Sequence, residues 1–153
     1  MFVLLLSACG GGSSGGTTAG SGRLTATQYR AHLRMIATES NSAQHAVEKG
    51  FQSTSVPQLV KVLTAFEASE KRIGSQVAAL KPPTNAVAAN TELAKGQHDT
   101  ATELQAVIPK IKKMPSAKAA VAYLERTPST KGGHEVDSAL AQLKKLGYIK
   151  NVS

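Results

Sequence analysis

The chain of 153 residues fits one domain and leaves little room for a second. Its formal net charge is +8, with most of the excess from Lys110 onward. Only three Phe and three Tyr occur and Trp is absent, so aromatic platforms for sugars or nucleobases are scarce. A single cysteine excludes an intramolecular disulfide and a zinc site with several cysteines. Abundant alanine favours helices that pack through small and aliphatic side chains.

The N-terminal segment differs in composition from the rest of the chain. A short apolar run over residues 2–6 is followed by Ser7, Ala8 and the single cysteine, Cys9. From residue 10 to residue 22 every position is Gly, Ser, Thr or Ala, which is the composition of a flexible, uncharged tether.

The residues Leu6, Ser7, Ala8 and Cys9 resemble the lipobox of bacterial prolipoproteins, in which an aliphatic and two small residues precede an invariant cysteine. The resemblance implies cleavage before Cys9, a diacylglyceryl group on its sulfur, and an extracytoplasmic protein held on a bacterial membrane. The two acyl chains of a diacylglyceryl group would anchor the protein stably, whereas a single chain binds a membrane only marginally. No Lys or Arg precedes the apolar run and the run is short, so we expect the natural translation start to lie upstream of Met1.

We therefore expect a signal peptide over residues 1–8, a lipidated cysteine and tether over 9–22, and a helical domain over 23–153. No stretch approaches the roughly 20 apolar residues that a helix needs to cross a bilayer. The membrane partner is thus expected to be reached through the lipid on Cys9.

A first helix is predicted over about residues 26–49. Thr25 and Gln28 have the spacing of a capping box, and Gly50 follows the last periodic residue. Apolar or small residues recur every three or four positions between them, as a helix with one buried face requires. These are Tyr29, Leu33, Ile36, Ser40, Ala43 and Val47.

A second helix is predicted from Ser55 to the Pro82-Pro83 pair. Ser55 and Gln58 repeat the capping spacing, Pro57 is tolerated in the first turn, and the two prolines should stop the helix. Its stripe again has steps of four and three. The stripe comprises Leu59, Leu63, Phe66, Glu70, Ile73, Val77 and Leu80.

After the Pro82-Pro83 pair, the sequence pattern predicts two further main helices with one short helix between them. Thr84 or Asn85 can cap a helix to about Ile108, which Pro109 should kink or end, and Ser116 can cap the short one. A loop rich in helix breakers is expected over residues 127–133.

The last helix carries apolar residues up to Leu146. Gly147 is expected as its C-cap, with Tyr148 or Ile149 covering the preceding turn.

The fold predicted from these elements is all-α: an antiparallel bundle of about four main helices with one short extra helix. Heptad spacing in the first two helices is also compatible with a coiled coil between chains, so the oligomeric state stays open.

Ser40 and Glu70 fall on otherwise apolar stripes near the middles of the first two helices. A carboxylate in a bundle core indicates a ligand, a metal or a buried pair, since an unpaired charge there is costly. The more ordinary alternative, which we expect, is that Glu70 leans to solvent or to a nearby lysine. A raised pKa and a buried, polar-lined cavity would argue against that alternative.

Neither a metal nor a cofactor is expected. His45 and Glu48 share a helical face, but di-metal bundles use the order Glu-x-x-His and repeat it, which this chain does not. Gly74 and Gly96 lie inside predicted helices, where they either permit close helix contact or mark a weak point.

The sequence predicts a binding module and not an enzyme. It has no nucleophile elbow and no phosphate-binding loop, since the Gly run at residues 10–12 lacks the following Lys. The leading expectation is a lipid-anchored helical module that binds a protein or envelope component, and the alternative is a small-ligand or metal-binding bundle around Glu70.

A basic patch is expected near the C-terminus. Outside a bacterial membrane it would meet anionic lipid headgroups or wall polymers, and not nucleic acid, or would simply be a solvated surface. Its lysines are Lys110, Lys112, Lys113, Lys144 and Lys145.

Overall fold

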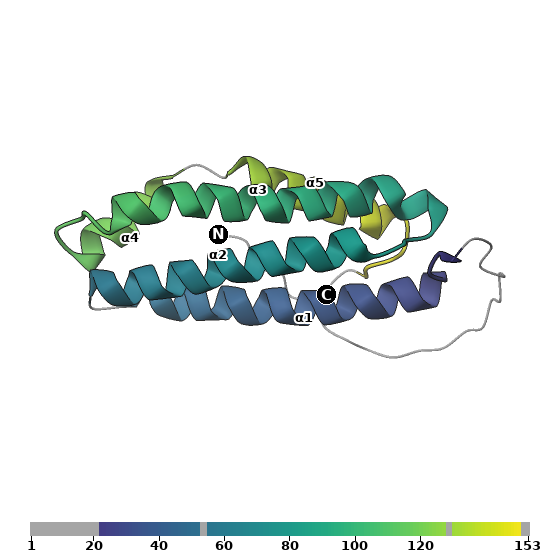
Figure 1. Ribbon diagram of the computed structural model, residues 1–153, viewed down its shortest axis with the longest axis horizontal. Coiled ribbons are helices and arrows are strands. Elements are labelled where there is room, and N and C mark those ends of the chain that lie inside the picture. Colours follow the sequence, from purple (N-terminus) through teal and green to yellow (C-terminus); the bar gives the residue numbers. More distant parts are fainter. Residues whose placement is uncertain (1–21, 53–54, 128–129, 151–153) are drawn as a thin grey trace.

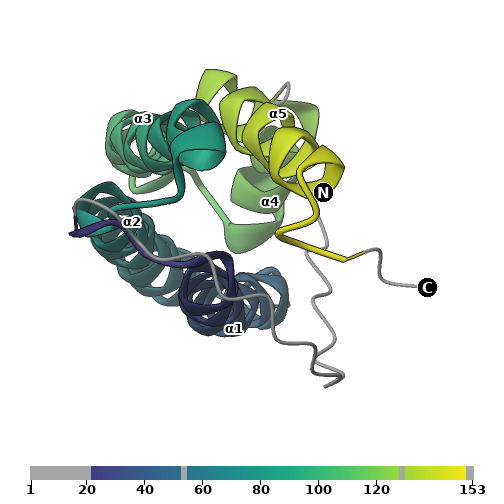
Figure 2. The same ribbon diagram turned by 90° about the vertical axis from the view of Figure 1, so that its right-hand side faces the viewer.

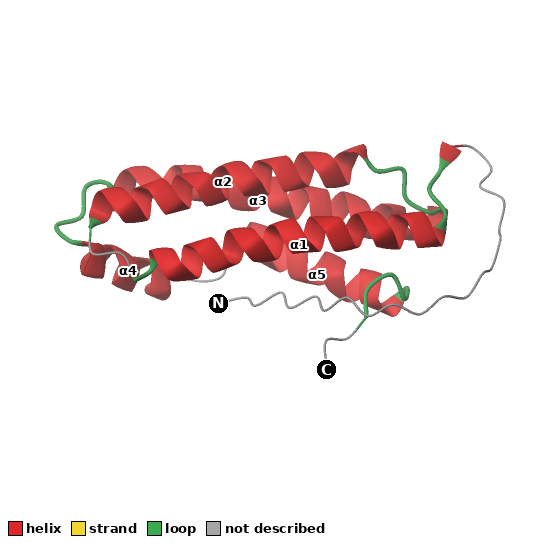
Figure 3. Ribbon diagram, turned by 90° about the horizontal axis from the view of Figure 1, so that it is seen from below, coloured by secondary structure: helices red, strands yellow, loops and turns green. Residues whose placement is uncertain are grey.

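The computed structural model describes residues 22–52, 55–127 and 130–150, and this part of the chain is helical and contains no strand (Figure 3). The lipobox residues Leu6, Ser7, Ala8 and Cys9, and the tether up to residue 21, lie outside the described residues. The helices are α1 (Ala26–Gly50), α2 (Val56–Ala79), the 3-10 helix η2 (Thr84–Ala86), α3 (Val87–Ile111), α4 (Ala117–Arg126) and α5 (Lys131–Lys145). The predicted all-α fold is confirmed.

The four longer helices form an antiparallel bundle in which each neighbour in the chain is also a neighbour in space (Figure 1). α2 packs against α1 on one side and α3 on the other, and α3 packs against α5. The short α4 lies at the end of the bundle where α3 ends, against the start of α2. The fourth side, between α1 and α5, is not closed by comparable helix packing, and the two helices stand apart in Figure 2.

The core consists of two apolar clusters, one toward each end of the bundle. The first gathers around Tyr29, Ile73 and Leu143, and the second around Leu59 and Ile111, all of them almost fully buried. Residues of the first cluster come from α1, α2, α3 and α5, whereas the second draws mainly on α2, α3 and α4. The set of helices that pack together therefore changes at the level between the two clusters.

Side-chain caps begin α1, α2 and α4 as the sequence predicts. Thr25 and Gln28 form the full capping box, with Gln28 N–H donating to Thr25 Oγ1 at 3.3 Å and Thr25 N–H donating to Gln28 Oε1 at 2.9 Å. At α2 only one of the two hydrogen bonds of a capping box forms, in which Ser55 Oγ accepts from Gln58 N–H at 3.4 Å. Ser116 Oγ accepts from Ala119 N–H at 3.2 Å.

The end of α5 is a Schellman cap, confirming the role expected of Gly147. Gly147 has φ +74°, and the N–H of Tyr148 donates to Leu143 O at 2.9 Å. The cap turns the Tyr148 ring onto Tyr29, with ring centroids 5.1 Å apart and an interplanar angle of 79°. The Tyr148 hydroxyl donates to Asn85 Oδ1 at 2.8 Å, which ties the chain end to the turn before α3.

Both ends of α3 differ from the prediction. Residues 84–86 form η2 and Ala86 precedes α3 without a side-chain cap, so neither Thr84 nor Asn85 caps this helix. α3 also continues through Pro109 to Ile111. Pro109 lies in the last turn, where its missing N–H removes one helical bond, and the fully buried Ile111 holds that turn against the core.

The start of α5 lies inside the segment predicted as a loop. Thr130 Oγ1 accepts from Gly133 N–H at 3.2 Å, so Gly132 and Gly133 belong to the first turn of the helix. A Cβ atom on Gly132 would lie 2.3 Å from the backbone nitrogen of Thr100. The sequence predicts a loop here because glycine breaks helices, whereas Gly132 allows α5 to contact α3 directly.

Gly96 on α3 has the same function, which the sequence left open. A Cβ atom there would lie 2.8 Å from the backbone nitrogen of Val136. A Cβ atom on Gly74 of α2 would lie 3.0 Å from Cδ2 of His98. Among the described helices, none is both long and apolar enough to cross a membrane.

Candidate functional site

A layer of buried polar side chains separates the two apolar clusters. Ser40 from α1, Glu70 from α2 and Gln97 from α3 are each only 4% exposed. Ser40 and Gln97 follow residues of the first cluster along their own helices, whereas Glu70 lies between the second cluster and the first on α2. The bundle thus brings together the two candidate residues, Ser40 and Glu70, and adds Gln97, which the sequence analysis missed.

Glu70 does not lean to solvent, so the expectation of an exposed carboxylate was wrong. Glu70 lies one helical turn before the buried Ile73 and two turns after the buried Leu63. It is therefore on the same face of α2 as these residues, and its side chain is directed into the bundle. Burial raises the pKa of Glu70 to about 8, because desolvation penalises the charged carboxylate. At neutral pH the side chain is therefore mostly a neutral carboxylic acid, able to donate as well as accept a hydrogen bond.

Glu70 and Ser40 line a cavity of about 260 Å³ between the open sides of α1 and α5. A second cavity of about 440 Å³ continues from it toward α4. We refer to the two together as the crevice. Their shared lining residues are Val47, Phe51, Phe66, Thr100, Thr130 and Gly133.

Two oxygen atoms at the crevice lack hydrogen-bond partners. Gln97 Oε1 and Glu103 Oε2 are buried and accept from no described group. The buried Asn90 offers a contrast, because it accepts from Tyr29 OH at 3.0 Å and donates to Val77 O at 2.9 Å. Buried polar atoms in folded proteins are rarely left in this condition, and an absent ligand or water is one recognised cause.

The crevice is otherwise mostly apolar. Phe51, Phe66 and Val47 give it a hydrophobic wall, and Val136 closes it from α5. Asp137 stands beside Val136 in the same lining, and burial raises the pKa of its carboxyl while His134 acts in the opposite direction. The lining can hold an apolar body and offers oxygen atoms to a polar group.

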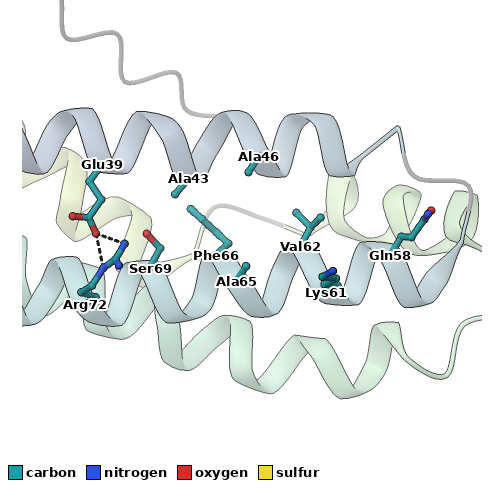
Figure 4. Close-up of a pocket in the computed structure, with 10 residues that line it drawn as sticks. All are labelled: Glu39, Ala43, Ala46, Gln58, Lys61, Val62, Ala65, Phe66, Ser69 and Arg72. Carbon is teal, nitrogen blue, oxygen red and sulfur yellow. Dashed lines mark hydrogen bonds and ion pairs between the residues drawn. The ribbon is translucent and has the colours of Figure 1, made fainter.

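A separate groove of about 560 Å³ runs along the outer seam of α1 and α2 (Figure 4). One end is closed by an ion pair between Arg72 and Glu39, with Nη2 and Oε1 2.6 Å apart. Phe66 projects between the two helices, and it lines this groove as well as the crevice. Phe66 therefore forms a wall between the outer groove and the interior.

The five lysines of the expected basic patch do not form one surface. Lys110 lies in the last turn of α3, and Lys112 and Lys113 follow it near α4. Lys144 and Lys145 end α5, which runs antiparallel to α3, so they lie at the opposite end of the bundle. Arg30 Nε donates to Gly147 O at 3.1 Å, which places the second group beside the start of α1.

The histidines show no metal-site geometry. His45 Nδ1 and Glu48 Oε2 are 3.1 Å apart on the exposed face of α1. No group of three or more potential metal ligands occurs among residues 22–52, 55–127 and 130–150.

The packing of α3 on α5 is reinforced by charged residues that the sequence analysis did not pair. Lys131 Nζ lies 2.9 Å from Asp99 Oδ2, and Lys95 contacts both Asp99 and Glu135. These exposed pairs hold the first turn of α5 in register, at the edge of the crevice.

What this arrangement offers is a preformed space with a hydrophobic wall and buried oxygen atoms. It has no metal cluster in the described residues, and its three most buried polar side chains come from three different helices. No family model, curated protein or solved structure matches the chain.

Proposed function

We propose that the helical domain is a non-enzymatic binding module that takes a small, largely apolar ligand into the crevice. We further propose that a lipid on Cys9 holds this module at the outer face of a bacterial membrane. The second part rests on the lipobox sequence alone, and the first rests on the shape and lining of the bundle interior.

The observation that supports ligand binding is the break in the core at the level of Ser40, Glu70 and Gln97. Protein interiors are normally packed as densely as organic crystals, and voids larger than a water molecule are few. A leucine at position 70 would have continued the apolar stripe of α2 and joined the two clusters into one core. A buried acid beside a cavity instead lowers stability, which is the usual cost of a binding site.

The dimensions also fit a small molecule. Ligand sites are typically concave, mostly apolar, roughly 300–1,000 Å³ in volume, and supplied with a few fixed polar groups. The larger cavity of the crevice, at about 440 Å³, falls inside that range, and the smaller one adds the polar layer.

The test is a pair of neighbouring substitutions on α1. Val47 lines the crevice and Ala46 lines the outer groove, so Val47→Trp should fill the first and Ala46→Trp the second. We expect octan-1-ol, used as an apolar probe and followed by protein NMR, to bind the full chain. Val47→Trp should abolish this binding, and Ala46→Trp should leave it unchanged.

The reverse pattern would place binding in the outer groove and contradict the proposal. Absence of any binding to the unsubstituted chain would contradict it as well. Circular dichroism of both variants provides the matched check on folding, since Val47 is only half-buried and Ala46 is exposed.

A further inference from the structure

The charges of the crevice differ in sign from those of the whole protein. The chain has 18 Lys and Arg against 10 Asp and Glu. Yet among the described residues that line the two cavities of the crevice there is no Lys, Arg or His, whereas five acidic side chains are present. These are Glu48, Glu70, Glu103, Glu125 and Asp137. Half of the acidic residues of a basic protein thus line the two cavities of the crevice.

We propose that the ligand of the crevice is an organic cation with an apolar body, such as an alkylammonium ion, whose head group is received by Glu70 and Gln97. This inference rests on the proposed function, because it specifies the chemistry of the molecule that the crevice binds.

The polar atoms of the crevice are those that a cationic donor requires. Gln97 Oε1 and Glu103 Oε2 are buried acceptors without partners, and Gln97 itself is 4% exposed. Glu70, also 4% exposed, adds a third oxygen-bearing group from the neighbouring helix α2. An ammonium group carries several N–H donors and no acceptor, so it can satisfy such oxygens without leaving a new unpaired acceptor.

An anionic ligand is disfavoured for the same reasons. A carboxylate or phosphate would bring its own acceptors to a lining that has five acids and no cationic side chain. Like charges in a partly desolvated space repel more strongly than in water.

A bare metal ion is disfavoured by the spacing of the acids. Calcium and magnesium need several oxygen ligands converging on one point. No group of three or more potential ligands occurs in the described parts of the chain, although five acids surround the space. A charge spread over a larger organic head group does not need such convergence.

The apolar body of the ligand is indicated by the apolar side chains in the same lining. Phe51 and Phe66 line both cavities, with Leu63, Leu104 and Val107 extending the wall toward α4. Aliphatic chains are stabilised in such a space because each buried methylene group is removed from water. Aromatic rings also attract cations to their faces, which suits an alkylammonium head better than a neutral one.

Three probes with the same tail separate the two proposals. Octylammonium, octan-1-ol and octanoate, each below its micellar concentration, are titrated into the full chain at about pH 8.5 and followed by calorimetry. We expect octylammonium to bind at least about tenfold more tightly than octan-1-ol, and octanoate to bind most weakly.

Substitution of the buried acid then locates the head group. Glu70→Gln should weaken octylammonium binding about tenfold and leave octan-1-ol binding unchanged. The matched control is Glu67→Gln, which makes the same chemical change one helical turn away on α2, outside the crevice lining. It should alter neither affinity. Asp137→Asn is a second variant, and it should weaken binding of the cation but not binding of octan-1-ol.

The outcomes distinguish the two proposals. If octan-1-ol or octanoate binds as tightly as the cation, or if Glu70→Gln and Asp137→Asn both leave cation binding intact, the charge inference is wrong and a neutral-ligand site remains. If none of the three probes binds, the proposed function fails first, and the inference fails with it.

Discussion

At the scale of single residues, Glu70 makes the stability of the domain depend on pH. Its pKa is raised from about 4.5 to about 8 by burial, so the folded state holds a proton that the unfolded chain releases. The stabilising contribution is complete below about pH 4.5 and is lost as the pH rises to about 8. We predict that the free energy of unfolding falls by a few kcal/mol over that window, at up to about 1.4 kcal/mol for each pH unit. Urea unfolding of the wild type and of Glu70→Gln at about pH 5 and about pH 8.5 measures this.

Glu70→Gln should be nearly insensitive to pH in the same range, while Glu67→Gln should retain the wild-type dependence. Parallel curves for the wild type and Glu70→Gln would show that another group causes the change.

The polar residues also mark how far the sequence can predict the site. The positions of Ser40 and Glu70 on apolar stripes could be recognised from spacing alone, because a helix repeats every 3.6 residues. Their burial could not, since a stripe drifts around a helix and the neighbours that cover it come from elsewhere in the chain. Gln97 carried a usable signal, because it continues the apolar series of Leu93 and Ala94 on α3 and precedes Ala101.

At the scale of elements, the contact between α3 and α5 depends on glycines that look like helix breakers. A Cβ atom at Gly132 would lie 2.3 Å from Thr100 N and 2.7 Å from Gly96 O, both backbone atoms that cannot move aside alone. We predict that Gly132→Ala lowers the free energy of unfolding by at least about 1–3 kcal/mol, as overpacking does. Chemical denaturation measures it, with Gly133→Ala as control.

Gly133 is suited to this comparison because it neighbours Gly132 in the same first turn. Its Cβ position meets only Thr130 Oγ1, at 3.3 Å. Gly133→Ala should be neutral, or stabilising by up to about 1 kcal/mol through helix propensity. Equal losses in both variants would mean that the turn, and not the interhelical contact, is sensitive.

Helix starts could be predicted from the sequence where a side-chain cap marks them, as at Thr25, Ser55 and Ser116. The start of α3 could not, because Ala86 carries no capping group and η2 precedes it. The start of α5 was missed because glycine can either break a helix or permit a close contact, and only the partner helix decides between these outcomes.

At the scale of the whole molecule, the proposed anchor determines where the bundle is held. We predict that the protein expressed from its natural translation start in a bacterial host is recovered with membranes, and that mass spectrometry finds a mature N-terminus at Cys9 carrying a diacylglyceryl group. Cys9→Ser should leave the chain uncleaved and free of lipid. A native protein with an unmodified Cys9 thiol would contradict the proposal.

The position of the α1 start has a consequence for how such a protein would stand on its membrane. Leu24 N–H donates to Lys81 O at 2.8 Å, and Arg30 reaches Gly147, so the chain enters the bundle at the end that carries Lys144 and Lys145. With the acyl chains attached through a short tether, that end would be the foot of an upright rod. Two lysines would then face the lipid phosphates, and Lys110, Lys112 and Lys113 would sit at the far tip. The crevice, set halfway up the side, would stay clear of the bilayer and open to molecules that pass along it.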